Sequence, residues 1–404
     1  MAEPAAKNIP LRVQWAVYVS GYLSTSMQNM AGVLIPLWVV VTLDPSALMI
    51  GIILGARNFL PTLLAIHGGA MMDLLGAKRV MMVFAIVSLL VHIMYPLVPW
   101  VWAVIILQMI GGLATTTSWM GAQTLIGQVM KGDVTHSGRL GSAALIGNLT
   151  VPPIIGAAWD ILGAWGAFLT MSLWAAGLFV AALILPAPSK EHLRASVRLC
   201  VRDFIPRPSS YLEALALLSI PAIALVVLMS VLRNTTYAVR GSFYVVYLDG
   251  IGLSGTEIGF LMSIAGLLGA GAALMVGCLS RVIKPVALLF VTVAGTIVFI
   301  SVPPLMATFW QLMIIAGLWG ASAGTSMPLM FSIMAKSANS QSQGKGVGLR
   351  LTANRLGATI LPVIMGAVAE VFGIGNSFLI IGTAMLLSLG GIALYARRLS
   401  DIGA

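Results

Sequence analysis

Between two long apolar regions the chain reads Pro186-Ala-Pro-Ser-Lys190-Glu-His-Leu-Arg194-Ala-Ser-Val-Arg198-Leu-Cys-Val-Arg202-Asp-Phe-Ile-Pro-Arg207-Pro-Ser-Ser210. This is the one long polar interruption in the sequence, and five of its residues are Lys or Arg. On each side of it lie six hydrophobic runs, and each is of the size that an α-helix needs to cross a bilayer, about 20 residues. The segment therefore predicts two sets of six membrane helices joined by a linker.

The composition excludes a soluble globular protein. Of 404 residues, 59% are hydrophobic and 8% are charged, with a mean hydropathy of +1.01, whereas a soluble domain has about 25% charged residues. Residues 1–12 contain no apolar core with a cleavage site, so we expect no removable signal peptide. Cys200 and Cys278 lack disulfide-scaffold or zinc-site spacing. The net charge of +10 is dispersed among apolar runs, so we expect no nucleic-acid partner.

The hydrophobic runs predict twelve transmembrane helices and an all-α polytopic membrane protein. We assign an N-terminal six-helix bundle to residues 1–186, a cytoplasmic linker to 187–212 and a C-terminal six-helix bundle to 213–404. The predicted spans are 13–43, 47–72, 79–98, 101–127, 141–162, 165–186, 213–247, 255–280, 285–304, 308–335, 346–372 and 376–396.

Basic residues lie on one side of these spans. Short cytoplasmic loops retain Lys and Arg, and 18 such residues fall at the termini and in alternate loops, while the opposite loops have none. The pattern predicts cytoplasmic termini in a cytoplasmic (inner) membrane. The basic linker either lies along anionic lipid or is an ordinary interdomain loop. The 18 residues are Lys7, Arg12, Lys78, Arg79, Lys131, Arg139, Lys190, Arg194, Arg198, Arg202, Arg207, Arg281, Lys284, Lys336, Lys345, Arg350, Arg397 and Arg398.

The two halves carry an internal repeat. A shift of about 208 residues aligns small or polar residues of helix 4 with those of helix 10, and a shift of 210 aligns helix 5 with helix 11. The pairs are Gly69/Gly277, Pro96/Pro304, Gly112/Gly320, Ser118/Ser326, Gly147/Gly357, Pro152/Pro362, Gly156/Gly366, Asp160/Glu370, Gly163/Gly373 and Phe168/Phe378.

Two parallel six-helix repeats resemble the major facilitator superfamily, whose substrate site lies between the halves at the bilayer midplane. A local motif supports this resemblance: Gly69-Ala-Met-Met-Asp73-Leu-Leu-Gly76-Ala-Lys78-Arg79 is similar to the family signature between helices 2 and 3. In the family this loop latches the halves together on the cytoplasmic side. The resemblance implies gating roles for Gly69, Asp73, Gly76, Lys78 and Arg79, and for Arg281 in the second copy, which lacks the acid.

Two further patterns of the family's drug exporters are incomplete. Gln108, four residues before Gly112, replaces the usual arginine of helix 4, and Pro152-Pro-Ile-Ile-Gly156-Ala matches the helix 5 motif only in part. The resemblance therefore favours a mechanism other than proton/drug exchange.

Four arginines are the exceptions to the sorted charges, because Arg57, Arg233, Arg240 and Arg355 lie within predicted spans. A charge near the bilayer centre costs at least about 2.5–3.5 kcal/mol, so it normally faces a cavity or a partner. Guanidinium groups stay protonated and bind carboxylates or phosphates in bidentate geometry. All 12 acidic residues lie at span ends or in loops. The pattern predicts a positively lined cavity for an organic anion.

Each arginine also has an alternative. Arg57 could pair with Asp44, and Arg240 could reach Asp249 or Glu257 as part of an outer gate. Arg355 could close the cytoplasmic gate, whereas Arg233 has no acidic neighbour within several turns and is the leading ligand candidate.

Polar neighbours complete the predicted site. Because helices 1, 4, 7 and 10 line the cavity in this family, the resemblance supports polar residues of these helices as its wall, although membrane hydroxyls can bond to their own helix instead. His92 is the one mid-span residue of a type that can titrate near neutral pH, so a proton-coupling role is an alternative for it. The candidate substrate residues, besides the arginines, are Asn234, Tyr237, Asn354, Gln28, Asn29, Thr116, Trp119 and Gln123.

These observations predict a secondary transporter, not an enzyme, that moves a small organic anion by alternating access. The alternative is a proton-coupled exporter of drugs or hydrophobic metabolites, and a third class is a membrane receptor or scaffold. The sequence has no G-x-x-x-x-G-K-[ST] loop, so we expect no bound nucleotide, cofactor or metal. The expected partners are the lipid bilayer and a small-molecule substrate, and we expect a monomer.

Overall fold

A computed structural model of the chain describes residues 9–130, 133–186, 218, 221–337 and 340–398. Within these ranges, the side chains of residues 65–71, 73–74, 134, 221–222, 334–337, 340–348 and 397–398 are not described. The predicted linker and the start of the seventh predicted span lie outside the described residues.

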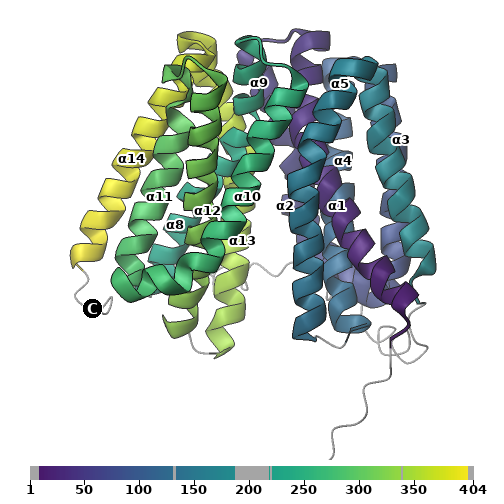
Figure 1. Cartoon of the computed structure of the whole chain (residues 1–404), viewed down its shortest axis with the longest axis horizontal. Coiled ribbons are helices and arrows are strands. Elements are labelled where there is room, and N and C mark those ends of the chain that lie inside the picture. The colour runs from purple at the N-terminus through teal and green to yellow at the C-terminus, as the bar shows by residue number, and fades with distance from the viewer. Residues whose placement is uncertain (1–8, 131–132, 187–217, 219–220, 338–339, 399–404) are drawn as a thin grey trace, which may run out of the picture.

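The described chain is an assembly of helices in two bundles (Figure 1). One bundle contains α1 to α5 and the other α8 to α14, and α1 begins at the same end of the molecule at which α14 ends. The elements are α1 (Leu11–Trp38) with a π-helical end (Val39–Leu43), α2 (Ala47–Leu75), α3 (Ala77–Leu97), α4 (Val101–Gln128), α5 (Val134–Ile184), α8 (Pro221–Arg240), α9 (Phe243–Gly250), α10 (Gly255–Val282), α11 (Pro285–Ser301), a 3₁₀ turn (Pro303–Leu305), α12 (Phe309–Ser337), α13 (Ser340–Phe372) and α14 (Ile374–Arg398).

Polar side chains define where several helices begin. Ser46 accepts a hydrogen bond from an amide of α2, and Ser254 and Glu257 form a capping box at the start of α10. Asp133 accepts from the amide of His136 at the start of α5, 2.9 Å away, and this bond lowers the pKa of the Asp133 carboxyl. These caps satisfy amides that have no partner within their own helix.

The predicted fold class is confirmed, with corrections to individual spans. In the described residues, ten helices are long and apolar enough to cross a membrane, and Pro285–Ser301 is a shorter apolar helix. The fifth and sixth predicted spans are the two arms of α5, which join at a kink at Gly163. The seventh span was predicted as one helix, but it breaks between Arg240 and Phe243 into α8 and α9. Gly241 and Ser242 form a turn there.

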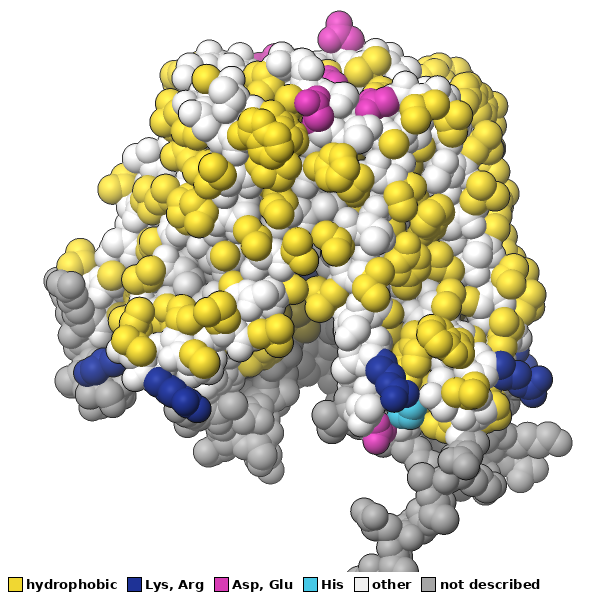
Figure 2. Space-filling view, in the orientation of Figure 1, with side chains coloured by type: hydrophobic (Ala, Val, Ile, Leu, Met, Phe, Trp, Pro, Cys, Tyr) yellow, Lys and Arg dark blue, Asp and Glu magenta, His cyan; other side chains and the backbone are white. Residues whose placement is uncertain are grey.

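Charges gather at the two ends of the molecule. Figure 2 shows most of the Asp and Glu side chains at one end, Lys and Arg side chains at the other end, where one acidic side chain also lies, and a band of apolar side chains between the ends. Leu387, Trp102 and Trp310 are more than 70% exposed, as expected where lipid replaces water. We call the end with Asp160 and Glu370 the acidic end, and the end where α1 begins the basic end.

Repeat-related residues occupy equivalent structural positions. Gly163 and Gly373 both have positive φ, 66° and 81°, at the turns that precede the last helix of each bundle. Phe168 and Phe378 are both buried just after these turns. Residues other than glycine rarely adopt this backbone conformation. The same glycine turn therefore reverses the chain in both halves.

The two halves meet along two helix pairs, α2 with α13 and the first arm of α5 with α10. A methyl group at Gly156 would collide with the backbone of Gly255, and one at Gly366 would meet the carbonyl oxygen of Ala47 at 2.6 Å. These repeat-related glycines let the helix backbones approach closely. These two close contacts between the halves lie toward the acidic end.

Carboxylates join the halves at the same end. Asp160, on α5, accepts hydrogen bonds from the amides of Gly255 and Thr256, each at 2.8 Å, and from the Thr256 hydroxyl at 2.6 Å. Its repeat mate Glu370, on α13, accepts from the amide of Leu48 at 2.9 Å. Each carboxylate thus binds the first turn of a helix in the other half, where the helix dipole favours negative charge. We call these two contacts the acidic-end junctions.

The basic end differs from the acidic end. Figure 2 shows a hollow between the two halves at the basic end, whereas the acidic end is covered. The structure is therefore closed at the acidic end and open at the basic end.

Gly163→Ala should destabilise the protein. The residue has φ 66° and ψ −170°, a region that costs a non-glycine residue about 1–3 kcal/mol, and no atom lies near enough to clash with the added methyl. Thermal unfolding in detergent should show a lower midpoint. Gly138→Ala, in the same helix and also free of clashes, is the control and should not lower it; equal midpoints for the two variants would contradict the strain.

Candidate substrate-binding cavity

A cavity of about 800 Å³ lies between the halves. This volume is within the range of small-molecule sites, roughly 300–1,000 Å³. Its lining comes from α1, α2, α4 and α5 of one bundle and from α8, α10, α12 and α13 of the other. The cavity thus draws on four helices of each bundle, whereas the family resemblance implied two from each.

Three of the four predicted arginines line the cavity: Arg57, Arg240 and Arg355. Arg57 Nη2 donates to the Gln28 carbonyl at 2.9 Å, and Arg240 Nη2 donates to the Met262 carbonyl at 2.6 Å. In the structure both guanidinium groups bind these backbone carbonyls instead of the carboxylates of Asp44, Asp249 or Glu257 that the alternatives named. A guanidinium has five N–H donors, so both groups retain donors for a ligand.

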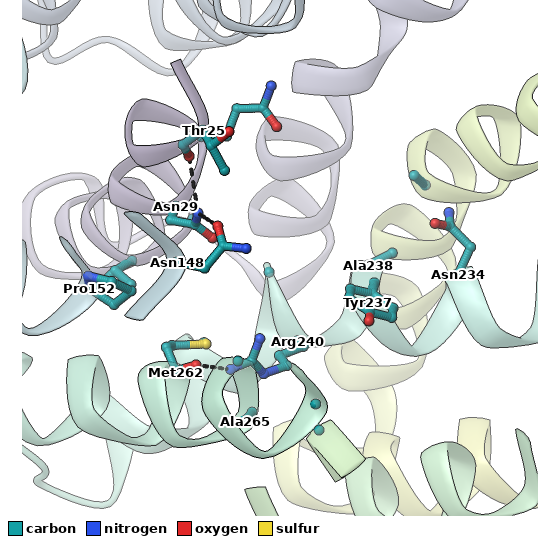
Figure 3. Close-up of a pocket in the computed structure, with 18 of the residues that line it drawn as sticks. Thr25, Asn29, Asn148, Pro152, Asn234, Tyr237, Ala238, Arg240, Met262 and Ala265 are labelled. Carbon is teal, nitrogen blue, oxygen red and sulfur yellow. Dashed lines mark hydrogen bonds between the residues drawn. The ribbon is translucent and has the colours of Figure 1, made fainter. Parts of the chain in front are cut away.

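An aromatic pair holds the Arg240 side chain. Its guanidinium carbon lies 4.5 Å from the centre of the Trp319 ring, and Trp319 contacts Tyr237 edge to face at 4.7 Å. All three residues line the cavity. The cation–π contact stabilises the charge without a carboxylate, and Figure 3 shows Arg240 with its hydrogen bond to Met262.

Arg233, the leading candidate from the sequence, does not line the cavity. Its Nε donates to Ser326 Oγ at 2.7 Å and its Nη2 to the Ala323 carbonyl at 3.1 Å and Tyr237 Oη at 2.9 Å. These bonds tie α8 to α12. In this conformation Arg233 holds the hydroxyl of Tyr237, which is a lining residue.

The neutral candidates also divide into residues that line the cavity and residues that do not. Asn354 is part of a polar contact between α13 and α8: its Nδ2 donates to Ser230 at 2.9 Å, and its carbonyl accepts from Asn234 at 2.7 Å. Gln123 is exposed near the basic end of α4. The predicted neutral residues that line the cavity are Gln28, Asn29, Thr116, Trp119, Asn234 and Tyr237.

Sequence reasoning missed several polar lining residues. Thr25 lies one turn before the predicted Asn29, while Asn58 and Asn148 lie on α2 and α5, which the expected cavity did not include. Asn148 follows Gly147, a residue of the internal repeat, and that position is the signal that could have found it.

Arg350 also differs from its prediction. The charge pattern groups it with the cations of the cytoplasmic side, whereas in the structure it is 3% exposed within α13. Its guanidinium carbon lies 5.1 Å from the centre of the Phe331 ring. This arginine therefore belongs with those that the membrane region encloses.

The predicted gate residues lie around the turn from α2 to α3. Gly76, with φ 82°, ends α2 and precedes Lys78 and Arg79 in α3. Lys78 Nζ donates to the carbonyl of Leu183 at 2.8 Å and to that of Leu185, at the end of α5 in the same bundle. Arg79 and Arg281, in the last turn of α10, are exposed. The side chains of Gly69 and Asp73 lie outside the described residues.

The lining of the cavity has one sign of charge. Among the described residues it contains three arginines and no Asp or Glu. No group of three or more His, Cys, Asp or Glu side chains in the described chain is arranged to hold a metal ion. The arrangement can bind and desolvate an anionic group, and it offers amides and hydroxyls to the rest of a ligand.

The fold and the cavity between its halves define a helical membrane transporter. The sequence matches the Major Facilitator Superfamily over residues 17–306 and 227–401, and the chain belongs to this family. No curated protein sequence matches it.

Solved structures share the fold at low sequence identity. The nucleoside transporter NupG is 14% identical with a TM-score of 0.78, over 95% of this chain and 98% of that one. A variant of NupG is 13% identical with a TM-score of 0.80, over 95% of this chain and 99% of that one. A POT family transporter in complex with a thioalcohol-conjugated peptide is 13% identical with a TM-score of 0.70, over 96% of each chain. Identities this low show the fold alone.

Arg233→Ala should lower stability more than Arg355→Ala does. Removal of Arg233 deletes the hydrogen bonds that join α8 to Ser326 and to the Ala323 carbonyl of α12, and a hydrogen bond to a charged group contributes about 1.5–3 kcal/mol. Arg355 makes no such side-chain bond between helices in the described structure. Thermal unfolding in detergent measures the difference. A larger loss for Arg355→Ala would show that the contacts of Arg233 are not structural.

Proposed function

We propose that this protein moves a small organic anion across the cytoplasmic membrane by alternating access. One observation carries the proposal: Arg57, Arg240 and Arg355 line one cavity whose described lining contains no carboxylate. Like charges repel more strongly in a site shielded from water than in solution. An anion that enters the cavity lowers this energy, so the cavity favours an anionic substrate.

The arginines are arranged for a ligand that spans the two halves. Arg57 lies on α2 of one bundle, while Arg240 and Arg355 lie on α8 and α13 of the other. The donors of Arg57 and Arg240 beyond their single carbonyl bonds can bind a carboxylate or phosphate with charge-assisted hydrogen bonds. An anion held from both halves would couple binding to the relative movement of the bundles.

The acidic-end junctions supply one gate for that movement. If Lys and Arg mark the cytoplasmic side, the structure is closed to the outside and open to the cytoplasm. Opening the outer side requires Asp160 and Glu370 to release the amides that they bind. We propose that the motif from Gly69 to Arg79, with Arg281, then closes the cytoplasmic side.

A neutral nucleoside is the second candidate substrate. Five carboxamides line the cavity together with Trp119 and Trp319, and such groups can bind a nucleobase and its sugar; the carboxamides are Gln28, Asn29, Asn58, Asn148 and Asn234. NupG, which shares the fold, is a nucleoside transporter. A drug exporter remains the alternative from the sequence, although three arginines disfavour lipophilic cations.

A binding panel separates these substrate classes. The purified protein should unfold at a higher temperature with a carboxylate or a phosphorylated compound than without ligand, because a ligand of the folded state stabilises it. Neutral nucleosides, dipeptides and lipophilic cations complete the panel. Stabilisation by nucleosides or cations, with no response to any anion, would overturn the proposal.

Arg240→Gln should weaken binding of the anion that the panel identifies by about 10- to 100-fold, the effect of losing a hydrogen bond to a charged group, about 1.5–3 kcal/mol. Isothermal titration calorimetry measures the affinity. Arg139→Gln, at an exposed position near the start of α5, removes the same charge outside the cavity and should leave the affinity unchanged. An equal loss in both variants would point to a general charge effect instead.

Asp160→Ala should open the acidic end. The substitution removes the acceptor of three hydrogen bonds between the halves, so spin labels at the exposed Thr42 and Asn376 should show longer distances by pulsed electron resonance. Glu257→Gln removes a negative charge at the same end, but its bonds stay within one half. It should leave the distances unchanged. An unaltered distance distribution in Asp160→Ala would exclude this junction as a gate.

A further inference from the structure

Two asparagines of the cavity wall form a fixed pair. Asn29, on α1, and Asn148, on the first arm of α5, both line the cavity. Asn29 Nδ2 donates to Asn148 Oδ1 at 2.6 Å and to the carbonyl of Thr25 at 3.0 Å. Figure 3 shows both bonds, with Arg240 on the facing wall.

The hydrogen bonds determine which way each amide points. A backbone carbonyl can only accept, so the atom of Asn29 that faces Thr25 must be its nitrogen. That nitrogen has two hydrogens, and the second is donated to Asn148, which must therefore present its oxygen. What the pair leaves over in the described structure is the oxygen of Asn29 and the NH₂ group of Asn148.

These two groups place one hydrogen-bond acceptor, Asn29 Oδ1, beside the two N–H donors of Asn148 on a wall of the cavity. In Figure 3 the nitrogen of Asn148 points away from Asn29, toward the open centre. A methyl at Gly266 of α10 would lie 3.8 Å from Asn148 Cβ, so the glycine leaves space beside the asparagine. The pair is thus open to a ligand at a point where the two halves adjoin.

A hydroxyl group is the complement of this pair, because it donates one hydrogen bond and accepts others. It can donate to Asn29 Oδ1 and accept from Asn148 Nδ2. An apolar group in the same place would cover both amides without satisfying them, which is how sites that hydrogen-bond a hydroxyl reject analogues that lack it.

We infer that the substrate is a hydroxylated organic anion, of the sugar-acid or hydroxy-acid class, whose hydroxyl binds Asn29 and Asn148 while its anionic group binds the arginines. This inference rests on the proposed function and narrows its substrate class. The asparagines act as specificity-determining residues, because they distinguish hydroxylated from plain carboxylates.

The test compares gluconate with hexanoate, two six-carbon carboxylates that differ in their hydroxyls. The intact protein should bind gluconate at least about tenfold more tightly, the effect of two hydrogen bonds, as measured by isothermal titration calorimetry. Equal affinities would overturn the inference and leave anion transport standing. Binding of no anion in this pair or in the panel would instead overturn the proposed function.

Asn148→Leu and Asn29→Leu should each bring the ratio of the two affinities to within about threefold, because leucine offers no hydrogen bond. A purely structural pair would weaken both ligands alike and keep the ratio. Asn148→Ser, which retains an acceptor for Asn29 but lacks the NH₂ group, gives the same prediction with less disturbance of packing.

Asn58→Leu is the matched control. Asn58 also lines the cavity, but its Nδ2 donates at 3.4 Å to the Ala358 carbonyl of the opposite half. Its replacement should alter both affinities by the same factor and keep their ratio. A ratio that falls equally in Asn58→Leu and in the pair variants would overturn the assignment to Asn29 and Asn148.

Discussion

The first amides of a helix have no partner within that helix, and this structure satisfies some of them from the opposite half. Asp160 and Glu370 accept hydrogen bonds from the first turns of α10 and α2. The repeat-related glycines Gly156 and Gly366 bring the backbones close enough for those bonds. Because both junctions lie at the acidic end, the cavity is closed there, and its opening lies at the basic end.

Two arginines of the cavity are held in place because carbonyl groups of neighbouring helices accept their hydrogen bonds. Arg57 and Arg240 each donate to a backbone carbonyl of another helix, and Arg240 also lies over Trp319. A carbonyl in a helix has a second lone pair, so it can accept such a bond without breaking the helix. These contacts hold the guanidinium groups in place without neutralising their charge, and the cavity keeps its affinity for an anion.

The internal repeat shows which properties the two halves share and which they do not. Turns and close contacts are equivalent, as Gly163 with Gly373 and Gly156 with Gly366 demonstrate. Pro152 and Pro362 both line the cavity, but Asn148 has Ala358 at the equivalent position of the wall. The halves therefore share their glycine turns and close helix contacts, and they differ in the side chains that line the cavity.

The membrane helices could be predicted from the sequence because apolar length and glycine turns are local properties. The two arms of α5 and the mid-span arginines follow from such local patterns. Which side chains face the cavity depends on how distant helices pack. Arg233 and Arg240 lie seven residues apart on nearly one face, yet Arg233 is held by α12 and only Arg240 lines the cavity. The sequence alone determined the helices and their charges, whereas only the tertiary structure decided which polar groups have donors left for a ligand, because that depends on contacts between helices far apart in the chain.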